Sequence, residues 1–344
     1  MRKKVLSIIL IIVLAFCACA CGGGEEMPKE PGENQVLDGA DRIVDIPEDP
    51  SSATLASVYA VAVPFMEALD ITDRVLAVNT KSEFWTDVDR DLDNAGTVGR
   101  GVVDLEALAK YNPTVLVHRS NDPTTVESVE KLGIDVLCIT VEDMEDIKYT
   151  LRMMGRYFGA EEKAEYVVSW IDKQYSDISE IVASIPEEEK KTALLMGGEL
   201  GRVAGNDMLQ TWMIEQAGGL PSVDTGKDHN WVDVGVEKVF DYNPDVIFCT
   251  SSTARDYTTE ELLEDSAWSA VKAVKNEEIY VIPSKYDSWD MPGISAVLGT
   301  LYMLYRMYPD YFTEEEFREK IDEYYTFMFG RTFDSDYLGY DISK

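Results

Sequence analysis

One segment of this chain occurs twice, and this repeat constrains the fold more than any other feature of the sequence. At a constant offset of 131 residues, LEALAKYNPTVLV (Leu105–Val117) matches VEKVFDYNPDVIF (Val236–Phe248). The identical pairs are Glu106/Glu237, Tyr111/Tyr242, Asn112/Asn243, Pro113/Pro244 and Val115/Val246. A chain of 344 residues is long enough for two domains, so the repeat predicts two similar lobes.

Each copy predicts a short amphipathic helix followed by a buried strand. The helix ends before Asn-Pro, because proline disfavours helix in the preceding residue and lacks the N–H that would continue the hydrogen bonding. The wholly apolar run that follows is typical of a strand buried on both faces of a parallel sheet. Polar loops come next, at His118–Pro123 and Thr250–Arg255. Open α/β sheets bind ligands at the carboxyl ends of their strands. The sequence therefore predicts two Rossmann-like α/β lobes with mainly parallel sheets, whose ligand loops face each other.

The N-terminus resembles a bacterial lipoprotein export signal. A basic start, Arg2–Lys4, precedes the apolar run Val5–Phe16, which is too short to span a bilayer. Three cysteines follow, at Cys17, Cys19 and Cys21. Cys19 or Cys21, each preceded by alanine, fits the lipidated residue better than Cys17. We expect a lipid anchor on the outer face of the cytoplasmic membrane; the alternative is an ordinary secreted protein.

A long amphipathic segment, Glu161–Ile185, separates the two copies. Its apolar residues recur at helical spacing, Gly159 ends the helix before it and Pro186 stops it. At about 1.5 Å per residue such a helix spans roughly 37 Å. The expected organisation is a signal and lipidation region at 1–21, a flexible tether at 22–40, a first lobe at 41–160, a single linking helix at 161–186 and a second lobe at 187–344.

The chain is strongly acidic, with 31 Lys and Arg against 64 Asp and Glu and a net charge of -33. Loss of the three basic residues of the signal would leave 28 against 64, a net charge of -36. Such a surface repels nucleic acid, so no nucleic-acid partner is expected. Outside the signal region, Cys138 and Cys249 each lie in a predicted buried strand. We expect them to be unpaired, and a disulfide that links the lobes is the alternative.

With these features the chain resembles the substrate-binding proteins of metal-chelate ABC importers, which capture ferric siderophores, haem and vitamin B12. The resemblance covers about Asp41–Gly330. Its strongest local matches are GTVGRGVVDLE (Gly96–Glu106), Gly218-Gly219 after a helix, and WVDVGVE (Trp231–Glu237), and the segment Ser288–Phe312 resembles the C-terminal helix of such proteins. The resemblance implies a monomer without catalytic activity or intrinsic cofactor, which delivers its ligand to permease and ATPase partners.

The resemblance also assigns a role to the repeated glutamates. In the vitamin B12-binding members, a glutamate from the matching helix of each lobe docks into arginine pockets of the permease. By position these residues correspond to Glu106 and Glu237. The alternative is a pair of solvated helix glutamates.

Basic and aromatic residues in predicted loops are the ligand-binding candidates. Lys81, Arg100, Arg119 and Arg202 stand out against the negative charge, and the first three fall where the vitamin B12 binders carry aromatic contacts. That departure favours an anionic ligand, because Arg and Lys neutralise carboxylate, catecholate or phosphate groups. The aromatic candidates for the cleft walls are Trp85, Trp231, Tyr286 and Trp289. By resemblance to some siderophore binders, His229 and Tyr286 could complete the coordination of an iron left open by its chelator.

Other function classes fit the sequence less well. A binder of bare zinc or manganese would need more ligands than His118 and His229. The chain has no P-loop, G-x-S-x-G, H-E-x-x-H or Rossmann glycine fingerprint, so an enzyme is not expected. Two alternatives stay open: the same class binding a molybdate- or tungstate-type oxyanion, and a surface sensor or adhesin on the same fold.

Overall fold

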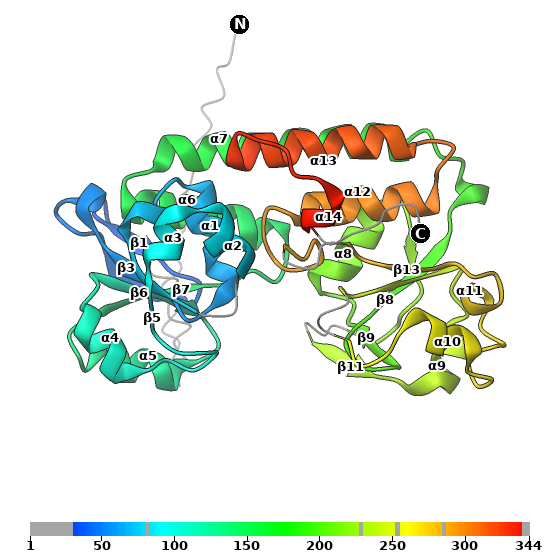
Figure 1. Cartoon of the computed structure of the whole chain (residues 1–344), viewed down its shortest axis with the longest axis horizontal. Coiled ribbons are helices and arrows are strands. Elements are labelled where there is room, and N and C mark those ends of the chain that lie inside the picture. Colours follow the sequence, from blue (N-terminus) through cyan, green and yellow to red (C-terminus); the bar gives the residue numbers. More distant parts are fainter. Residues whose placement is uncertain (1–29, 80–82, 227–229, 252–254, 284–286, 339–344) are drawn as a thin grey trace, which may run out of the picture. The chain divides into compact units, whose positions relative to one another are not determined.

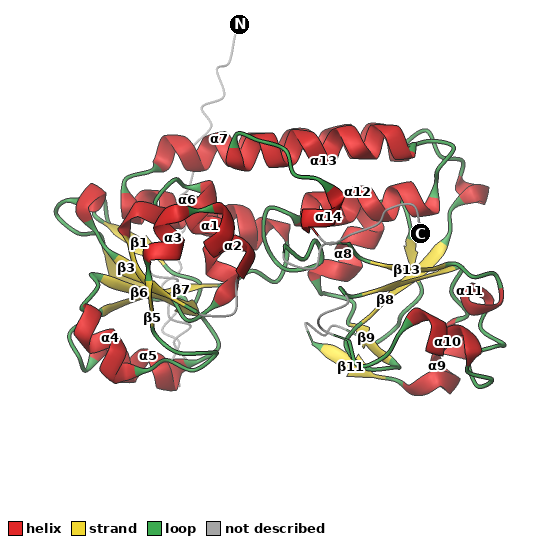
Figure 2. Ribbon diagram, in the orientation of Figure 1, coloured by secondary structure: helices red, strands yellow, loops and turns green. Residues whose placement is uncertain are grey.

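The computed structural model describes residues 30–79, 83–226, 230–251, 255–283 and 287–338. Pro31–Lys344 forms one compact unit, distinct from Met1–Glu30. Within Pro31–Lys344 the chain builds two α/β lobes, each around its own sheet, as predicted (Figure 1, Figure 2). The described helices include none that is long and apolar enough to cross a membrane.

In the described residues, the sheet of the first lobe has five strands, which are all parallel and follow the order β5-β4-β3-β6-β7. These strands are β3 (Leu55–Ala56), β4 (Val75–Val78), β5 (Gly96–Thr97), β6 (Val115–Arg119) and β7 (Asp135–Ile139). The helices of this lobe are α1 (Val63–Ala68), α2 (Glu83–Val88), α3 (Arg90–Asn94), α4 (Leu105–Tyr111), α5 (Pro123–Glu130) and α6 (Met144–Phe158). They cover both faces of the sheet (Figure 2), which explains why β6 and β7 consist mainly of buried, apolar residues.

The second lobe has a mixed sheet with the order β11-β9-β8-β12-β13, and β10 pairs with β8. In its described strands β9 pairs antiparallel with both β8 and β11, and the other pairings are parallel. The strands are β8 (Thr192–Met196), β9 (Arg202–Ala204), β10 (Leu220–Pro221), β11 (Trp231–Asp233), β12 (Val246–Cys249) and β13 (Ile279–Val281). Its helices are α8 (Leu209–Gln216), α9 (Gly235–Tyr242), α10 (Thr259–Glu264), α11 (Lys272–Lys275), α12 (Ala296–Met307), α13 (Glu314–Phe329) and α14 (Ser335–Leu338). Short 3-10 helices lie at Pro50–Ser52, Ala60–Ala62, Thr72–Arg74 and Glu187–Glu189.

The helix between the lobes is α7, Glu161–Val182, which ends three residues before the predicted Ile185. The reason is local: the N–H groups of Ser184 and Ile185 bond back three residues, so the last turn tightens before Pro186. The lobes also have a second connection, which was not predicted. Helix α13 runs beside α7 (Figure 1), and the ring of Phe327 stacks on Trp170 with the centroids 4.6 Å apart.

The repeat is visible in the structure as two matching units, α4 with β6 and α9 with β12. Both helices end at the predicted asparagine, which takes the left-handed conformation in each case: Asn112 has φ 48° and ψ 56°, and Asn243 has φ 45° and ψ 56°. Asparagine tolerates this conformation better than most residues. The proline that follows then starts the turn into a buried strand, as expected.

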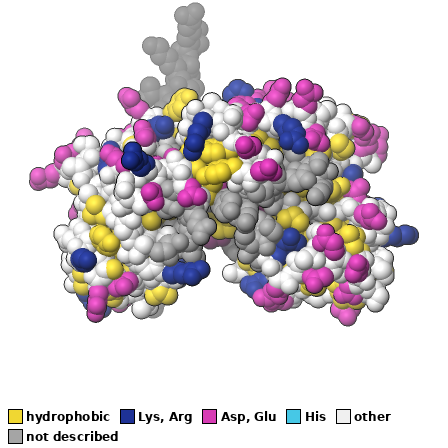
Figure 3. All heavy atoms as spheres, in the orientation of Figure 1, with side chains coloured by type: hydrophobic (Ala, Val, Ile, Leu, Met, Phe, Trp, Pro, Cys, Tyr) yellow, Lys and Arg dark blue, Asp and Glu magenta, His cyan; other side chains and the backbone are white. Residues whose placement is uncertain are grey.

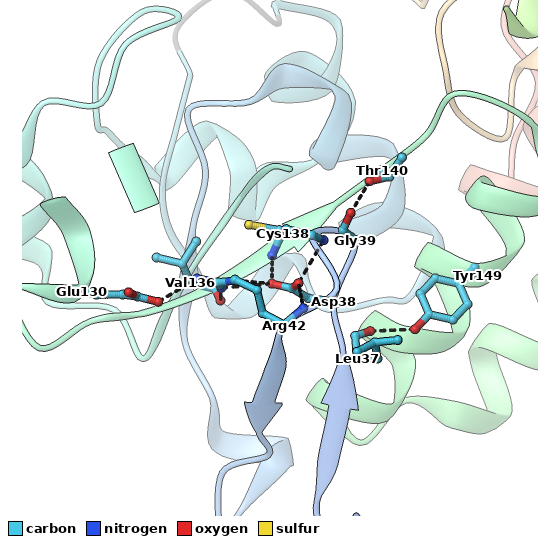
Figure 4. Close-up of polar contacts among 10 residues, drawn as sticks. Leu37, Asp38, Gly39, Arg42, Glu130, Val136, Cys138, Thr140 and Tyr149 are labelled. Carbon is cyan, nitrogen blue, oxygen red and sulfur yellow. Dashed lines mark hydrogen bonds and ion pairs between the residues drawn. The ribbon is translucent and has the colours of Figure 1, made fainter. Parts of the chain in front are cut away.

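The predicted tether at 22–40 extends too far into the chain. Gln35–Leu37 forms β1, which pairs antiparallel with β2 (Ile43–Asp45). The turn between them is fixed to β7 by the carboxylate of Asp38, which accepts a hydrogen bond from the backbone N–H of Cys138 at 3.1 Å (Figure 4). Arg42 bonds both Asp38 and Glu130 and donates to the carbonyl of Val136. Buried polar contacts thus order a segment whose sequence is rich in turn-forming residues.

Cys138 and Cys249 are free and buried, as expected. Burial raises the pKa of the Cys138 thiol to about 12 and that of Cys249 to about 11. Neither thiol is therefore a reactive thiolate at neutral pH.

Candidate functional site

A pocket of about 560 Å³ opens in the second lobe. Two of its residues, Gly198 and Thr250, follow the last residues of the parallel strands β8 and β12. This is the carboxyl edge of the sheet, where the fold class places ligands. The residues that line the pocket are Gly198, Glu199, Arg202, Trp231, Thr250, Arg255, Asp256 and Met291. Its volume is in the range of small-molecule sites.

Two arginines give the pocket its cationic side. Arg202 begins β9 and reaches Glu199 at 3.5 Å and Asp233 at 4.0 Å, which are long contacts on a partly exposed side chain. Arg255 differs, because its Nε and Nη1 atoms are buried and have no hydrogen-bond partner in the described part of the chain. Its guanidinium lies 5.2 Å from the ring centroid of Tyr257. Buried N–H groups without partners favour a ligand that accepts hydrogen bonds.

Trp231 supplies the aromatic wall. It lies on β11, which pairs antiparallel with β9, so that Trp231 lies opposite Ala204. The ring approaches Gly197 so closely that a Cβ there would come within 2.8 Å of it. The position of the ring thus depends on a glycine at 197. Trp231 and Arg202 line the same pocket, and their contact with a ligand stays a prediction.

The floor of the pocket is held by a buried carboxylate. The hydroxyl of Thr250 donates to Asp290, which also accepts from Ser288 at 3.1 Å. The Ser288 hydroxyl in turn contacts the Ser251 hydroxyl at 2.5 Å. Burial raises the pKa of Asp290, and the hydrogen bonds from Thr250 and Ser288 oppose this shift. This network ties the end of β12 to the segment that carries Met291, and so shapes one side of the pocket.

In the first lobe, the end of β6 presents a different arrangement. Arg119 is partly exposed and lies 3.3 Å from the carboxylate of Asp122, which also contacts Nε2 of the buried His118 at 3.1 Å. Burial lowers the pKa of His118, while the hydrogen bond to Asp122 opposes this shift, so the imidazole is neutral at neutral pH. Arg100 is exposed in a turn and has no ion-pair partner in the described chain. On the face in Figure 3, acidic side chains are interspersed with basic ones.

Trp289 and Trp85 were predicted to line the cleft, but both side chains are buried. Trp289 is fully buried, its Nε1 donates to the hydroxyl of Tyr325 at 3.1 Å, and its ring packs on Phe317. Trp85 is also buried, and its ring packs against Phe84 and Phe329. Both side chains therefore belong to the core, because α13 covers them.

Three further candidates, Lys81, His229 and Tyr286, lie outside the described residues, as do Cys17, Cys19 and Cys21. The predicted completion of an iron site by His229 and Tyr286 accordingly stays a prediction. Among the residues that are described, no group of three or more His, Cys, Asp or Glu side chains could hold a metal ion.

The repeated glutamates lie in the first turns of equivalent helices, Glu106 in α4 and Glu237 in α9. Both helices lie along the lower edge of the unit in Figure 1, whereas α7 and α13 lie along the upper edge.

Arg255 is the main residue that sequence reasoning missed. It closes the polar loop predicted at Thr250–Arg255, so its place at the carboxyl edge of the sheet was a usable signal. What the sequence could not indicate is that two of its nitrogens are buried without partners.

Residues 55–286 match the model of the periplasmic binding protein family. This chain belongs to that family. It is 23% identical over 287 residues to the ABC transporter substrate-binding lipoprotein YvrC of Bacillus subtilis, with 81% of this chain and 87% of that protein covered. The match confirms the resemblance found in the sequence and makes the protein a substrate-binding protein of an ABC importer, a class that works with permease and ATPase partners.

Two further relatives have different named ligands. The molybdate-binding protein MolA of Haemophilus influenzae is 21% identical over 329 residues, with 88% of this chain and 92% of MolA covered. Its molybdate-bound structure superposes with a TM-score of 0.74 at 17% identity, covering 88% of this chain and 99% of that one. The Ni(II)-bound CeuE of Helicobacter pylori gives a TM-score of 0.72 at 18% identity, with 89% and 99% covered. At this identity the structures establish the shared fold, and they leave the ligand of this protein open.

Proposed function

We propose that this protein is a lipid-anchored receptor that captures an anionic iron chelate, such as a ferric siderophore or haem, or a related corrinoid, for an ABC importer. The observation that carries the proposal is that two buried guanidinium nitrogens of Arg255 lack hydrogen-bond partners in the described chain, in a pocket that Arg202 also lines, in a protein with a net charge of -33. Retaining two arginines at one pocket of such an acidic protein favours a ligand with carboxylate or catecholate oxygens. Trp231 can pack against the chelate, and its fixed ring needs no ordering on binding.

Residues of the first lobe complete the proposed site. Arg119 lies at the end of β6, the strand equivalent to β12, and its guanidinium is partly exposed. Together with Arg100 and Lys81 it would add positive charge opposite Arg202 and Arg255. His229 and Tyr286 are proposed to complete the coordination of the bound metal where the chelator leaves positions open. The metal is then cargo of the chelate, and binding involves no chemical step.

The test is to purify the protein from its own organism and record its visible spectrum and native mass. Ferric chelates, haem and corrinoids each absorb in the visible, and the mass identifies the bound species. The Arg255→Gln variant should lose at least about tenfold in affinity for that species, since it removes charge-assisted hydrogen bonds from a desolvated site. Arg331→Gln is the control, because Arg331 is exposed and does not line the pocket. A native ligand without metal, or an unchanged affinity in Arg255→Gln, contradicts the proposal.

A molybdate- or tungstate-type oxyanion is the second candidate, favoured by the likeness to MolA over 88% of this chain. Arginine N–H groups suit a tetrahedral oxyanion as well as a carboxylate. Such an ion would occupy a small part of a 560 Å³ pocket, which is why the chelate is preferred. Metal analysis of the purified protein separates the two, because molybdenum without visible absorption indicates the oxyanion.

A lipid on Cys19 or Cys21 would hold the protein at the outer face of the cytoplasmic membrane. Glu106 and Glu237 would dock it to the permease. Opposite charges across the interface orient the complex and speed its formation. Reversing both glutamates to lysine should abolish transport and leave ligand affinity intact. If the double-lysine variant supports transport at the normal rate, the docking role is wrong. If the unaltered protein supports no transport, a sensor or adhesin role is favoured instead.

A further inference from the structure

The surface around the two repeated glutamates is apolar as well as acidic. In the described chain no ion pair or side-chain hydrogen bond engages the carboxylate of Glu106 or Glu237. Large exposed apolar side chains flank each of them, although most apolar residues of the protein are buried. Exposed apolar side chains that are rimmed by charged groups are typical of protein-contact sites.

In the first lobe these side chains are Val102 and Leu105, which are 76% and 37% exposed. Leu105 begins α4 and directly precedes Glu106. Val102 lies in a turn that is closed by a bridge between Gly99 and Val103. Gly99 has φ +118°, and a Cβ there would come within 2.1 Å of the Val102 carbonyl oxygen. The turn therefore requires this glycine, and its geometry presents Val102 to the outside.

In the second lobe the corresponding side chains are Phe240 and Leu200, which are 49% and 41% exposed. Phe240 follows Glu237 by three residues on α9, so the two share one face of the helix. Leu200 lies in the turn between β8 and β9. The N–H of Val234 donates to the carbonyl of Gly201 at 2.8 Å, which ties this turn to the start of α9.

The repeat makes these apolar positions informative. At the same offset of 131 residues, Val102 corresponds to Asp233 and Phe240 corresponds to Ala109. Of the four, only Leu105 has an apolar counterpart directly beside the other glutamate, Val236. Each glutamate nevertheless has exposed apolar side chains near it.

We propose that Val102, Leu105, Leu200 and Phe240 are the apolar anchors of the surface that binds the ABC permease, with Glu106 and Glu237 among them. This inference rests on the proposed docking role of the glutamates. The partner is the outward-facing surface of the permease, which presents basic groups to the carboxylates and apolar sites to the anchors. Helices α4 and α9 lie on the same side of the unit, opposite α7 and α13, so one partner can reach both (Figure 1). Apolar anchors supply affinity, while the charged pair supplies orientation and association rate.

The experiment measures binding of the full-length protein to its cognate permease–ATPase complex in lipid nanodiscs. Val102→Ser and Phe240→Ser should each raise the dissociation constant at least about tenfold, because each removes a desolvated apolar contact. Leu132→Ser and Leu220→Ser are matched controls, since these leucines are similarly exposed and lie near the amino ends of β7 and β10, whereas Glu106 and Glu237 lie in the first turns of α4 and α9. The controls should bind within about twofold of the unaltered protein.

Salt separates the two kinds of contact. Raising the salt concentration should weaken the effect of Glu106→Lys and Glu237→Lys, because charges are screened, and should leave the effect of the serine variants in place. Serine variants that bind like the controls, while the lysine variants lose binding, overturn the apolar anchors and keep the proposed function. An unaltered protein that fails to bind the complex overturns the proposed function itself.

Discussion

The two lobes share a helix–Asn-Pro–strand unit but differ at the end of the strand. In the first lobe β6 ends in Arg119, a partly exposed cation beside Asp122. At the equivalent position of the second lobe, Thr250 donates to the buried Asp290 and lines the pocket. The two copies share the helix, the Asn-Pro turn and the buried strand. They differ in the residues that follow the strand. One lobe presents charge, and the other builds a pocket floor.

The lobes also differ in what α13 contributes to them. By sequence α13 belongs to the second lobe, yet its Tyr325 and Phe329 pack on Phe84 of α2 in the first. Phe333 extends the same aromatic group, 6.0 Å from Phe84 between ring centroids. The first lobe is therefore stabilised in part by residues of the second, which a simple picture of two lobes on one linking helix does not include.

The largest expected effect tests this dependence. Phe84→Ala should lower the free energy of unfolding by about 3–5 kcal/mol, because it empties a fully buried aromatic site. Phe240→Ala, at an exposed ring, is the control and should change it by less than about 0.5 kcal/mol. Urea unfolding followed by tryptophan fluorescence measures both. Similar small losses in the two variants would show that α13 contributes little to the first lobe.

Predictions of helices and strands that rest on local sequence patterns agree with the structure, whereas those that depend on packing between distant segments do not. The helices that end at Asn112 and Asn243, the buried strands after them and the linking helix all follow from short-range patterns. Arg202 and Trp231, which line one pocket, were predicted as ligand contacts from their positions relative to the strands, which is also a local signal. Trp85 and Trp289 were misplaced, since a tryptophan near a strand end has the same sequence context on a cleft wall and under α13. The missing partners of Arg255 depend on how the whole lobe packs, which no local pattern encodes.

Two carboxylates, one in each lobe, should respond to pH with opposite signs. Burial raises the pKa of Asp287 to about 6, with hydrogen bonds from Tyr325 and Ser295 opposing it. Burial would also raise the pKa of Asp122, but the hydrogen bonds from His118 and Thr125 outweigh it and hold this pKa below its usual value. The folded state thus binds a proton at Asp287 more tightly than the unfolded state does, and at Asp122 less tightly.

Asp287→Asn tests the second-lobe side of this contrast. Because the folded pKa of Asp287 lies above its unfolded value of about 4, its contribution to stability is fully present below pH 4 and is lost as pH rises through about 6. The loss is about 3 kcal/mol for a shift of about two units. Asparagine keeps an acceptor for the Tyr325 hydroxyl, which donates to Asp287 at 3.1 Å, and cannot ionise. Unfolding free energies between pH 4 and 7 should therefore fall less steeply in this variant than in the exposed-site control Asp310→Asn, and parallel curves would refute the assignment.

The smallest expected difference concerns the two asparagines that end α4 and α9. Both have the same backbone conformation, but the Asn243 side chain also accepts a hydrogen bond from the N–H of Lys272 at 3.1 Å. Alanine in a left-handed conformation costs about 1 kcal/mol, so Asn112→Ala should destabilise by about that amount. Asn243→Ala should cost about 2 kcal/mol, because a hydrogen bond worth about 1 kcal/mol is lost as well.

Glycine variants isolate that extra contact, because glycine adopts the left-handed conformation without strain. Asn112→Gly should be close to neutral, whereas Asn243→Gly should still lose about 1 kcal/mol of unfolding free energy. Equal values for the two glycine variants would mean that the bond to Lys272 adds nothing to stability. The two copies would then be energetically equivalent at their helix ends, and the divergence between the lobes would be confined to the strand ends and the pocket.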